Sequence, residues 1–291
     1  MTFFYRHKPW YAGQFVRMVK PKFKVTEGVS LFFNVILNKL SAPLLNVLVR
    51  NVDDTFVKSV IRLPVSSAGL PNFAFMEKFV AELKAQRVAE LKAYLTAAGL
   101  NDTTLTLEEE EALQHLQNGQ IEFADFNLKE LFGKAARGKR LKSDDRITGS
   151  IPFITAGESN EGFSDYIGND VRIFPKNTVT IDMFGSAKYR NYEYGADDHV
   201  AIVFTQDLPR HCAIFVASAT HKATYTGQYN YGNNFYASDA DVTSIKLPIN
   251  LQGEPDYGLM RTIISAVEKL VICDVVAFAD KKIDATKQII S

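Results

Sequence analysis

An internal repeat constrains the fold of this chain more than any other feature of its sequence. Residues 61–76, IRLPVSSAGLPNFAFM, align without gaps on residues 245–260, IKLPINLQGEPDYGLM, with six of the sixteen positions identical. At the same offset of 184 residues, residues 5–16 align on residues 189–200 and share a Tyr-Arg pair, an aromatic residue, an alanine and a valine. Because two distant segments agree on one offset, the sequence predicts a tandem duplication.

The first copy of the repeat is predicted to be incomplete. The second copy is expected to open at FADFNLKELF, which follows the polar break QNGQ, and the counterpart of this opening would precede Met1. The missing front would include the counterpart of a basic loop, GKAARGKRLK. We therefore expect about one and a half copies of the repeating unit.

Each copy is predicted to have a mixed, β-rich front followed by a long helix, so the expected fold class is α+β. Strands are predicted at IPFITAG, VRIFPKNTVTIDMFG, HVAIVF and CAIFVASA, and LFFNVIL in the first copy is expected to match the last of these. Apolar residues recur at helical spacing in residues 75–99 and again in residues 257–287. The first of these helices would be roughly 40 Å long at ~1.5 Å per residue. The two apolar stripes are predicted to pair antiparallel as a coiled-coil spacer; the alternative is that each helix caps its own domain.

Composition excludes several classes of protein. An apolar fraction of 46% excludes disorder, and two cysteines, Cys212 and Cys273, give no disulfide framework and favour a cytoplasmic protein. The richest apolar stretch is interrupted by polar residues, so no membrane span is expected. The charge is balanced at 33 basic and 33 acidic residues, but it is spread unevenly. Residues 1–26 carry six basic residues and no acidic one, and residues 134–146 form a second basic run. Such runs either steer an anionic partner or are solvated loops.

The motifs of common enzymes are missing from the sequence. The five histidines have no HExxH spacing, there is no CxxC, and neither a GxSxG elbow nor a Walker loop occurs. His211 and Cys212 are interpreted as a loop histidine and a buried cysteine before a strand. We therefore predict a non-catalytic chain with no metal site and no cofactor of its own.

Four segments, taken in order, resemble the blocks of a target-recognition domain: FNLKELFGKAARGKRL, GSIPFITAGESNEGFSDYIG, NTVTIDMFGSAKYRNYEYGADDHVAIV and IKLPINLQGEPDYGLM. The family is the specificity (S) subunits of type I restriction–modification systems, together with the similar recognition subunits of BcgI-like enzymes. The resemblance covers residues 123–256. It implies two target-recognition domains, each reading half of a split DNA site, separated by two long helices.

On this pattern, four regions are expected. Residues 1–72 would be the truncated C-terminal part of the first target-recognition domain, residues 73–118 the first spacer helix region, residues 121–256 the second recognition domain and residues 257–291 the second spacer helix region. Three explanations for the missing front stay open: a truncated or rearranged gene, a half subunit completed by another polypeptide, and a symmetric assembly of two chains.

The resemblance also implies the partners. They are double-stranded DNA, methyltransferase (modification) subunits and an endonuclease or motor subunit, with a second copy of the chain as a further candidate. S-adenosylmethionine, Mg²⁺ and ATP are expected only on the partner subunits. The alternative function is a non-catalytic assembly or anti-restriction factor that binds partner subunits through its helices.

Basic side chains are expected to hold phosphates and set the register on DNA, whereas polar and aromatic loop side chains are expected to read bases. The predicted phosphate contacts are Lys134, Arg137, Lys139, Arg140 and Lys142. The predicted base or groove contacts are Glu158, Ser159, Asn160, Ser186, Lys188, Tyr189, Arg190, Tyr192, Tyr229, Asn230 and Asn233. Gly185 is expected either to let the backbone approach DNA or to be an ordinary hairpin glycine.

Overall fold

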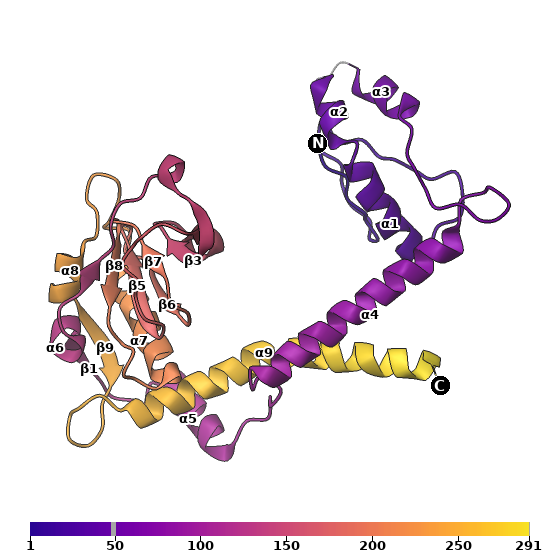
Figure 1. Cartoon of the computed structure of the whole chain (residues 1–291). Helices are drawn as coiled ribbons and strands as arrows, with labels where there is room; N and C mark the ends of the chain where they lie inside the picture. The colour runs from indigo at the N-terminus through magenta and orange to yellow at the C-terminus, as the bar shows by residue number, and fades with distance from the viewer. Residues whose placement is uncertain (48–50, 291) are drawn as a thin grey trace. The chain divides into compact units, whose positions relative to one another are not determined.

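The computed structural model describes residues 1–47 and 51–290, with side chains described as far as Asp284. The chain divides into two compact units (Figure 1). Unit 1 contains Met1–Asn101 and the end of the chain from Asp274, and unit 2 contains Asp102–Cys273. Each unit is described by itself. Among the described helices, none has a stretch that is both long enough and apolar enough to cross a membrane.

Unit 2 is built around a four-stranded antiparallel sheet with the order β2-β8-β5-β6. The bounds of its strands are β2 Ala136–Arg137, β5 Thr178–Asp182, β6 Ala187–Arg190 and β8 Val200–Val203. All residues of β5 and β8 are buried, so these strands are covered on both faces. Their β-branched side chains suit such a position. The predicted strands at IPFITAG, within VRIFPKNTVTIDMFG and at HVAIVF are confirmed.

A second sheet has the order β4-β3-β7, with bounds β3 Thr148–Ile154, β4 Phe163–Ile167 and β7 Gly195–Ala196. Ile154 of β3 packs with Val200 and Ile202 of β8 in a small core between the two sheets. Two short 3₁₀ helices, η1 (Ser143–Asp145) and η2 (Ser159–Gly162), lie in the loops before β3 and β4.

Helix α7 (Arg210–Thr224) covers the first sheet (Figure 1). The larger core of unit 2 joins Val216 of α7 to Ile181 of β5 and to Leu247 of β9 (Ser244–Pro248). Strand β9 pairs antiparallel with β1 (Phe123–Asn127), and the short helices α6 (Leu128–Phe132) and α8 (Ala237–Val242) flank this pair. The first and the last strand of unit 2 therefore pair in one two-stranded ribbon.

The predicted strands at CAIFVASA and LFFNVIL are wrong, because both segments are helical. The first lies in α7, and the second lies in α1 (Glu27–Asn38). The buried residues of α7 are Cys212, Ala213, Val216, Ala217, Thr220 and Thr224. They recur at intervals of three and four, which is the period of a helix. His211 accordingly lies in a helix, not in a loop before a strand.

Helix α5 (Leu107–Gln117) packs on the first half of α9 (Tyr257–Ile290) within unit 2. Glu109 is 6% exposed and accepts hydrogen bonds from Lys269 Nζ at 2.8 Å and from Ser265 Oγ at 2.6 Å. Burial by itself raises the pKa of Glu109, but the hydrogen bonds from Lys269, Ser265 and the Thr106 backbone outweigh it and lower the pKa to about 2.

Unit 1 contains α1, α2 (Ser41–Asn46), α3 (Val52–Lys58) and the long helix α4 (Phe73–Ala97). The predicted first long helix is confirmed, and Gly99 follows its end with a φ of 70°. Helix α1 packs along α4, where the rings of Phe32 and Phe79 lie 6.0 Å apart. Later in α4, Lys92 pairs with Asp280 of α9 at 2.8 Å, also within unit 1.

Apolar residues remain exposed along both long helices. On α4 they include Phe79 and Tyr94, and on α9 they include Leu270 and Val271. A coiled coil formed by the two helices would bury such residues, so the predicted antiparallel coiled coil stays a prediction.

Equivalent features recur at the offset of 184 residues. The turn before α4 has a bridge between Val65 and Pro71, and the turn before α9 has one between Ile249 and Pro255. Asn72 caps α4 by accepting from the Phe75 N–H, as Asp256 does for the Leu259 N–H in α9. Helices α1 and α3 lie at the same offset from α7 and α8. The two turns therefore use the same hydrogen bonds at equivalent positions.

Candidate functional site

The backbone of the basic run is anchored to the protein while its side chains reach solvent. The Gly138 N–H bonds to Val200 O at 3.2 Å, the Lys139 N–H bonds to Ala196 O at 2.9 Å, and a Cβ at Gly138 would lie 2.2 Å from Ala196 O. The five predicted phosphate contacts are all exposed: Lys134, Arg137, Lys139, Arg140 and Lys142. A rigid, close-fitting backbone thus presents five cations outward.

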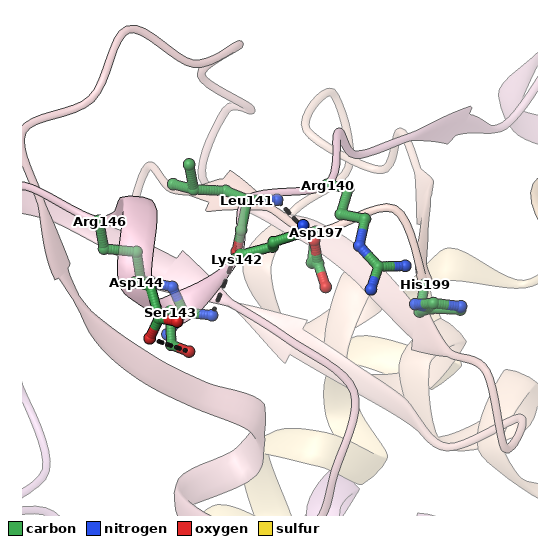
Figure 2. Close-up of a pocket in the computed structure, with 8 residues that line it drawn as sticks. All are labelled: Arg140, Leu141, Lys142, Ser143, Asp144, Arg146, Asp197 and His199. Carbon is green, nitrogen blue, oxygen red and sulfur yellow. Dashed lines mark hydrogen bonds between the residues drawn. The ribbon is translucent and has the colours of Figure 1, made fainter.

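A shallow pocket of about 360 Å³ lies beside this run (Figure 2). Its lining includes three basic side chains, one histidine and two carboxylates: Arg140, Lys142 and Arg146, then His199, then Asp144 and Asp197. Arg146 is held by a hydrogen bond to Ser164 Oγ at 2.7 Å and by the face of the Phe153 ring. The lining thus has three basic side chains against two carboxylates.

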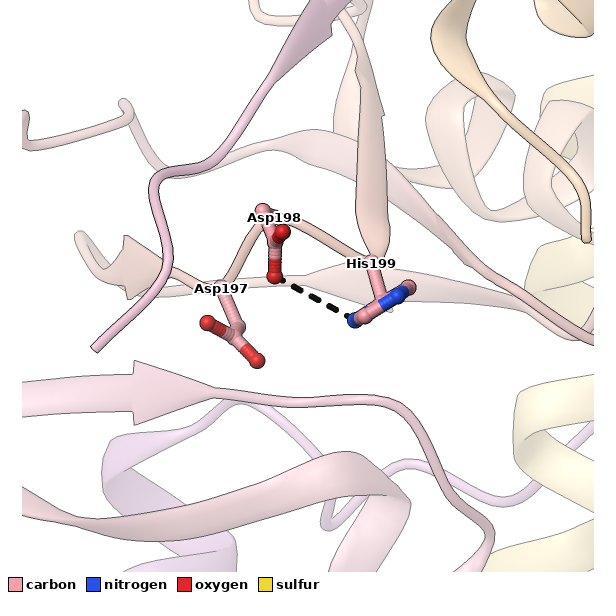
Figure 3. Close-up of side chains that lie close together, drawn as sticks. All are labelled: Asp197, Asp198 and His199. Carbon is pink, nitrogen blue, oxygen red and sulfur yellow. Dashed lines mark ion pairs between the residues drawn. The ribbon is translucent and has the colours of Figure 1, made fainter. Parts of the chain in front are cut away.

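Asp197, Asp198 and His199 form the one group among the described residues with ligand atoms spaced for a metal ion (Figure 3). Asp198 Oδ2 pairs with Arg137 at 3.3 Å, whereas Asp198 Oδ1 lies 3.2 Å from His199 Nδ1 and accepts no hydrogen bond from the described residues. Asp197 Oδ1 accepts the Leu141 N–H at 3.1 Å. Because Asp197 Oδ1 and Asp198 Oδ2 both bond to the basic run, we interpret the cluster as its support.

The β5–β6 hairpin changes the predicted set of base contacts. Arg190 and Ser186 are each only 1% exposed. The Arg190 guanidinium donates to Thr180 Oγ1 at 3.0 Å and to Glu161 O at 2.7 Å. The prediction that Ser186 and Arg190 contact a base directly is therefore corrected, because both side chains are enclosed within unit 2.

The exposed loop 157–162 contains three of the predicted base contacts. Glu158, Ser159 and Asn160 are all exposed, and their carboxylate, hydroxyl and amide groups can bond to base edges. Asn160 and Glu161 have φ values of 47° and 56°, in the left-handed region. A residue other than glycine in that region costs about 1–2 kcal/mol, so other contacts have to hold this loop in place.

Three further candidates, Lys188, Tyr189 and Tyr192, are only partly exposed. Lys188 pairs with Glu158 at 3.2 Å and with Asp182 at 3.7 Å. The Tyr189 hydroxyl donates to Asn177 Oδ1 at 2.9 Å, and burial raises the pKa of Tyr189. Tyr192 lines a second shallow pocket, of about 370 Å³, with Pro152, Phe163 and Tyr166. All three thus have partners within the protein, since the Tyr192 hydroxyl accepts from Arg190 Nη1 at 3.4 Å, and Tyr192 in addition lines the pocket.

The tyrosine-rich loop after α7 presents a different set. Asn230 and Asn233 are exposed and close a turn on each other through two backbone hydrogen bonds of 3.0 Å. Tyr229 packs edge-on against the buried Phe235. Tyr231 is 85% exposed and stands edge-on to Phe184. Tyr231 and Phe184 were not predicted as contact residues. The position of Tyr231 in the middle of an Asn-rich turn was the sequence feature that could have indicated it.

Gly185 supports the hairpin interpretation. Its φ is 84°, its N–H bonds to Asp182 O at 2.8 Å, and a Cβ there would lie 2.3 Å from Thr224 O at the end of α7. The close approach that requires glycine is therefore to the protein's own helix.

Three comparisons with known proteins relate to these features. Residues 120–254 match the family of the type I restriction modification DNA specificity domain. Over 155 residues, 52% of the chain, the sequence is 26% identical to the specificity subunit S.BcgI of the type II restriction enzyme BgcI from Heyndrickxia coagulans. The match covers 45% of that subunit, so the chain spans less than half the length of this curated relative.

Two solved structures are also similar at low identity. The S subunit of a type I restriction-modification system from M. genitalium has a TM-score of 0.45 and 13% identity, over 89% of this chain and 69% of that one. A chain from a structure of the type I R-M system, described for complex assembly and conformational transition, has a TM-score of 0.41 and 13% identity, over 89% and 67%.

Proposed function

We propose that this chain, whose residues 120–254 belong to the type I restriction modification DNA specificity domain family, is the sequence-specific DNA-recognition subunit of a restriction–modification complex. The observation that carries the proposal is the anchored basic run, which lies inside the matched region and presents five exposed cations. Cations at fixed positions neutralise phosphates and set the register of a protein on DNA.

In this proposal, unit 2 reads one DNA half-site. Lys134, Arg137, Lys139, Arg140 and Lys142 contact phosphates. Glu158, Ser159 and Asn160 read base edges, with Tyr192, Asn230 and Asn233 as further groove contacts. Lys188, Tyr189 and Tyr229 support these contacts without reading bases, because each is only partly exposed and has a partner within the protein.

The chain is proposed to have no catalytic role of its own. Methylation and cleavage would belong to modification and endonuclease subunits, and S-adenosylmethionine, Mg²⁺ and ATP would bind there. Exposed apolar residues along α4 and α9, such as Phe79 and Leu270, support docking of partner subunits on these helices. The same residues favour the second candidate function, an assembly or anti-restriction factor that binds the partner subunits without reading DNA.

We also propose that residues 1–107 and residues 185–291, which align at the offset of 184, arose by duplication. The shared turn geometry before α4 and α9, the matching caps at Asn72 and Asp256, and the common offset of α1 and α7 support it. Two long helices, one after each copy, are then the expected spacer between two recognition units.

A charge-reversal variant tests DNA recognition. Arg140→Glu combined with Lys142→Glu should weaken DNA binding and reduce the slope of log K against log salt by about 2, roughly one for each phosphate that is no longer neutralised. Arg137 is left intact, because it pairs with Asp198 and holds the loop. Lys176→Glu with Lys222→Glu, also exposed and in unit 2, makes the same change of net charge outside the basic run and should have a smaller effect.

The outcome separates the two candidate functions. Binding measured by fluorescence anisotropy at several salt concentrations should distinguish the two double variants. If both variants bind like the wild type, the basic run does not contact DNA. If the wild type binds no DNA but co-purifies with a modification subunit, the assembly factor is the better assignment.

A further inference from the structure

The exposed loop 157–162 is fixed at three points, and all three anchors come from the β5–β6 hairpin. At its start, the Gly157 N–H bonds to Asp182 Oδ2 at 3.1 Å. Next to it, Glu158 pairs with Lys188 at 3.2 Å. At its end, Arg190 donates to Glu161 O at 2.7 Å. The β5–β6 hairpin therefore supports the loop along its length, in addition to the β3–β4 pairing at its base and the bond from the Thr155 N–H to Gly162 O at 2.8 Å.

Arg190 is the anchor at the part of the loop with the least favourable backbone. Arg190 donates to the carbonyl oxygen of Glu161. Both Glu161 and the preceding Asn160 have a left-handed backbone conformation. Two consecutive residues other than glycine in that region are held only when the surroundings determine them. Gly162 follows, also with a positive φ of 79°, and a Cβ there would lie 2.5 Å from Thr155 O.

The guanidinium of Arg190 is itself held rigidly. Thr180 Oγ1, on the neighbouring strand, accepts from Nε at 3.0 Å, and the side chain is 1% exposed. The Tyr192 hydroxyl lies 3.4 Å from Nη1. The planar guanidinium holds its N–H donors in a fixed fork, so it can impose one geometry on the acceptors around it. A lysine ammonium has no such fork and does not reproduce this geometry.

We propose that Arg190 is a positioning residue that sets the base-reading conformation of the loop 157–162, and thereby the DNA sequence preference of unit 2, without touching DNA. This inference rests on the proposed function. The side chains of Glu158, Ser159 and Asn160 are exposed on the loop, so their direction toward a base edge follows from its backbone. Hydrogen-bond readout requires that direction, because base contacts are geometrically specific.

The first experiment measures sequence preference separately from overall binding. The wild-type chain and Arg190→Lys are each equilibrated with a pool of randomised DNA duplexes, and the selected motif and the affinity ratio between motif and random duplex are determined. Arg190→Lys should lower this ratio by about tenfold, since one good base contact discriminates by 1–3 kcal/mol. Its salt dependence should stay unchanged, because the phosphate contacts are untouched. Arg172→Lys, at an exposed arginine of the same unit, is the matched control.

A rescue experiment distinguishes positioning from a loss of general stability. Glu161→Gly keeps the backbone carbonyl but removes the steric cost of the left-handed conformation. Combined with Arg190→Lys, it should restore part of the sequence preference, because the loop then reaches its conformation with less support. A defect of the hairpin core would be unaffected by a glycine in the loop. Thermal unfolding of each variant shows whether preference and stability change together.

Thr180→Val supplies a second route if Arg190→Lys does not fold. The substitution has nearly the same shape and removes the acceptor of Arg190 Nε, so the sequence preference should fall by about threefold or more, as expected for a weakened hydrogen bond. An unchanged preference in a folded Arg190→Lys or Thr180→Val variant would overturn the inference while the proposed function stands. The inference would also be overturned if the sequence preference of Arg190→Lys fell together with its thermal stability and Glu161→Gly did not restore it. A wild-type chain without any sequence preference would overturn the proposed function, and this inference with it.

Discussion

Two glycines of unit 2 have nearly the same backbone angle but different surroundings. Gly185 has a φ of 84° and Gly227 a φ of 83°. A Cβ at Gly185 would lie 2.3 Å from Thr224 O, whereas a Cβ at Gly227 would have no atom within 4 Å. The pair therefore separates the cost of the left-handed conformation from the cost of a steric clash.

Alanine substitutions at these two glycines should differ in stability. Gly227→Ala should lower the free energy of unfolding by about 1 kcal/mol, the cost of a left-handed alanine. Gly185→Ala should lower it by about 3 kcal/mol or more, because the end of α7 must also move away from the β5–β6 turn. Urea denaturation of the two variants measures the difference. Equal losses would show that the hairpin and α7 do not approach each other closely in solution.

At the scale of elements, the sequence predicted those with clear periodicity. The helix α4, the end of that helix near Gly99 and the strands β3, β5 and β8 were predicted. Helices α1 and α7 were not, because a mostly apolar run of seven or eight residues suits a buried strand and a buried helix equally well. Such a choice is decided by tertiary packing, here of Val216 and its neighbours on the sheet.

The candidate site was predictable to a similar degree. The exposure of the basic run follows from its charge density, since so many cations are rarely buried. The burial of Arg190 could not be predicted. Lys188 and Arg190 lie on the same face of strand β6, and nothing in the sequence shows whether that face is covered. The partners of Arg190, Thr180 and Glu161, are 10 and 29 residues away along the chain.

The packing of α5 on α9 should depend on pH through Glu109. The folded pKa of about 2 lies below the ordinary value of 4.5, so ionised Glu109 stabilises the fold. This contribution is fully present above about pH 4.5 and is lost as the pH falls toward 2. Glu109→Gln should lower the free energy of unfolding at neutral pH by about 2 kcal/mol, as for a hydrogen bond to a charged group.

The comparison with the wild type should itself change with pH. The difference between wild type and Glu109→Gln should narrow as the pH is lowered from about 5 toward 2, where Glu109 becomes protonated. Glu111→Gln, on the same helix but exposed, should differ little from the wild type at any pH. A difference that is constant with pH would mean that the ion pair of Glu109 with Lys269 does not form in solution.

At the scale of the whole molecule, two segments that align at the offset of 184 residues have different structures. Residues 200–203 form β8, which pairs with β5 and β2 and is fully buried. The equivalent residues 16–19 form no strand, and Val16 is 53% exposed where Val200 is 1% exposed. The turns at residues 65–71 and 249–255, by contrast, have matching hydrogen bonds.

Amide hydrogen exchange should reveal this asymmetry between equivalent segments. The amides of residues 200–203 should be strongly protected, because opening them requires separation of a central strand. The amides of residues 17–19 should exchange far faster, since no hydrogen bond to them is found among the described residues. Peptides that cover the two equivalent turns are the internal control and should be protected to a similar extent. Residues 17–19 could instead be as protected as β8, with a protection that grows with protein concentration. That result would mean that a strand from a second chain pairs with residues 17–19, and that these residues are exposed only in the single chain.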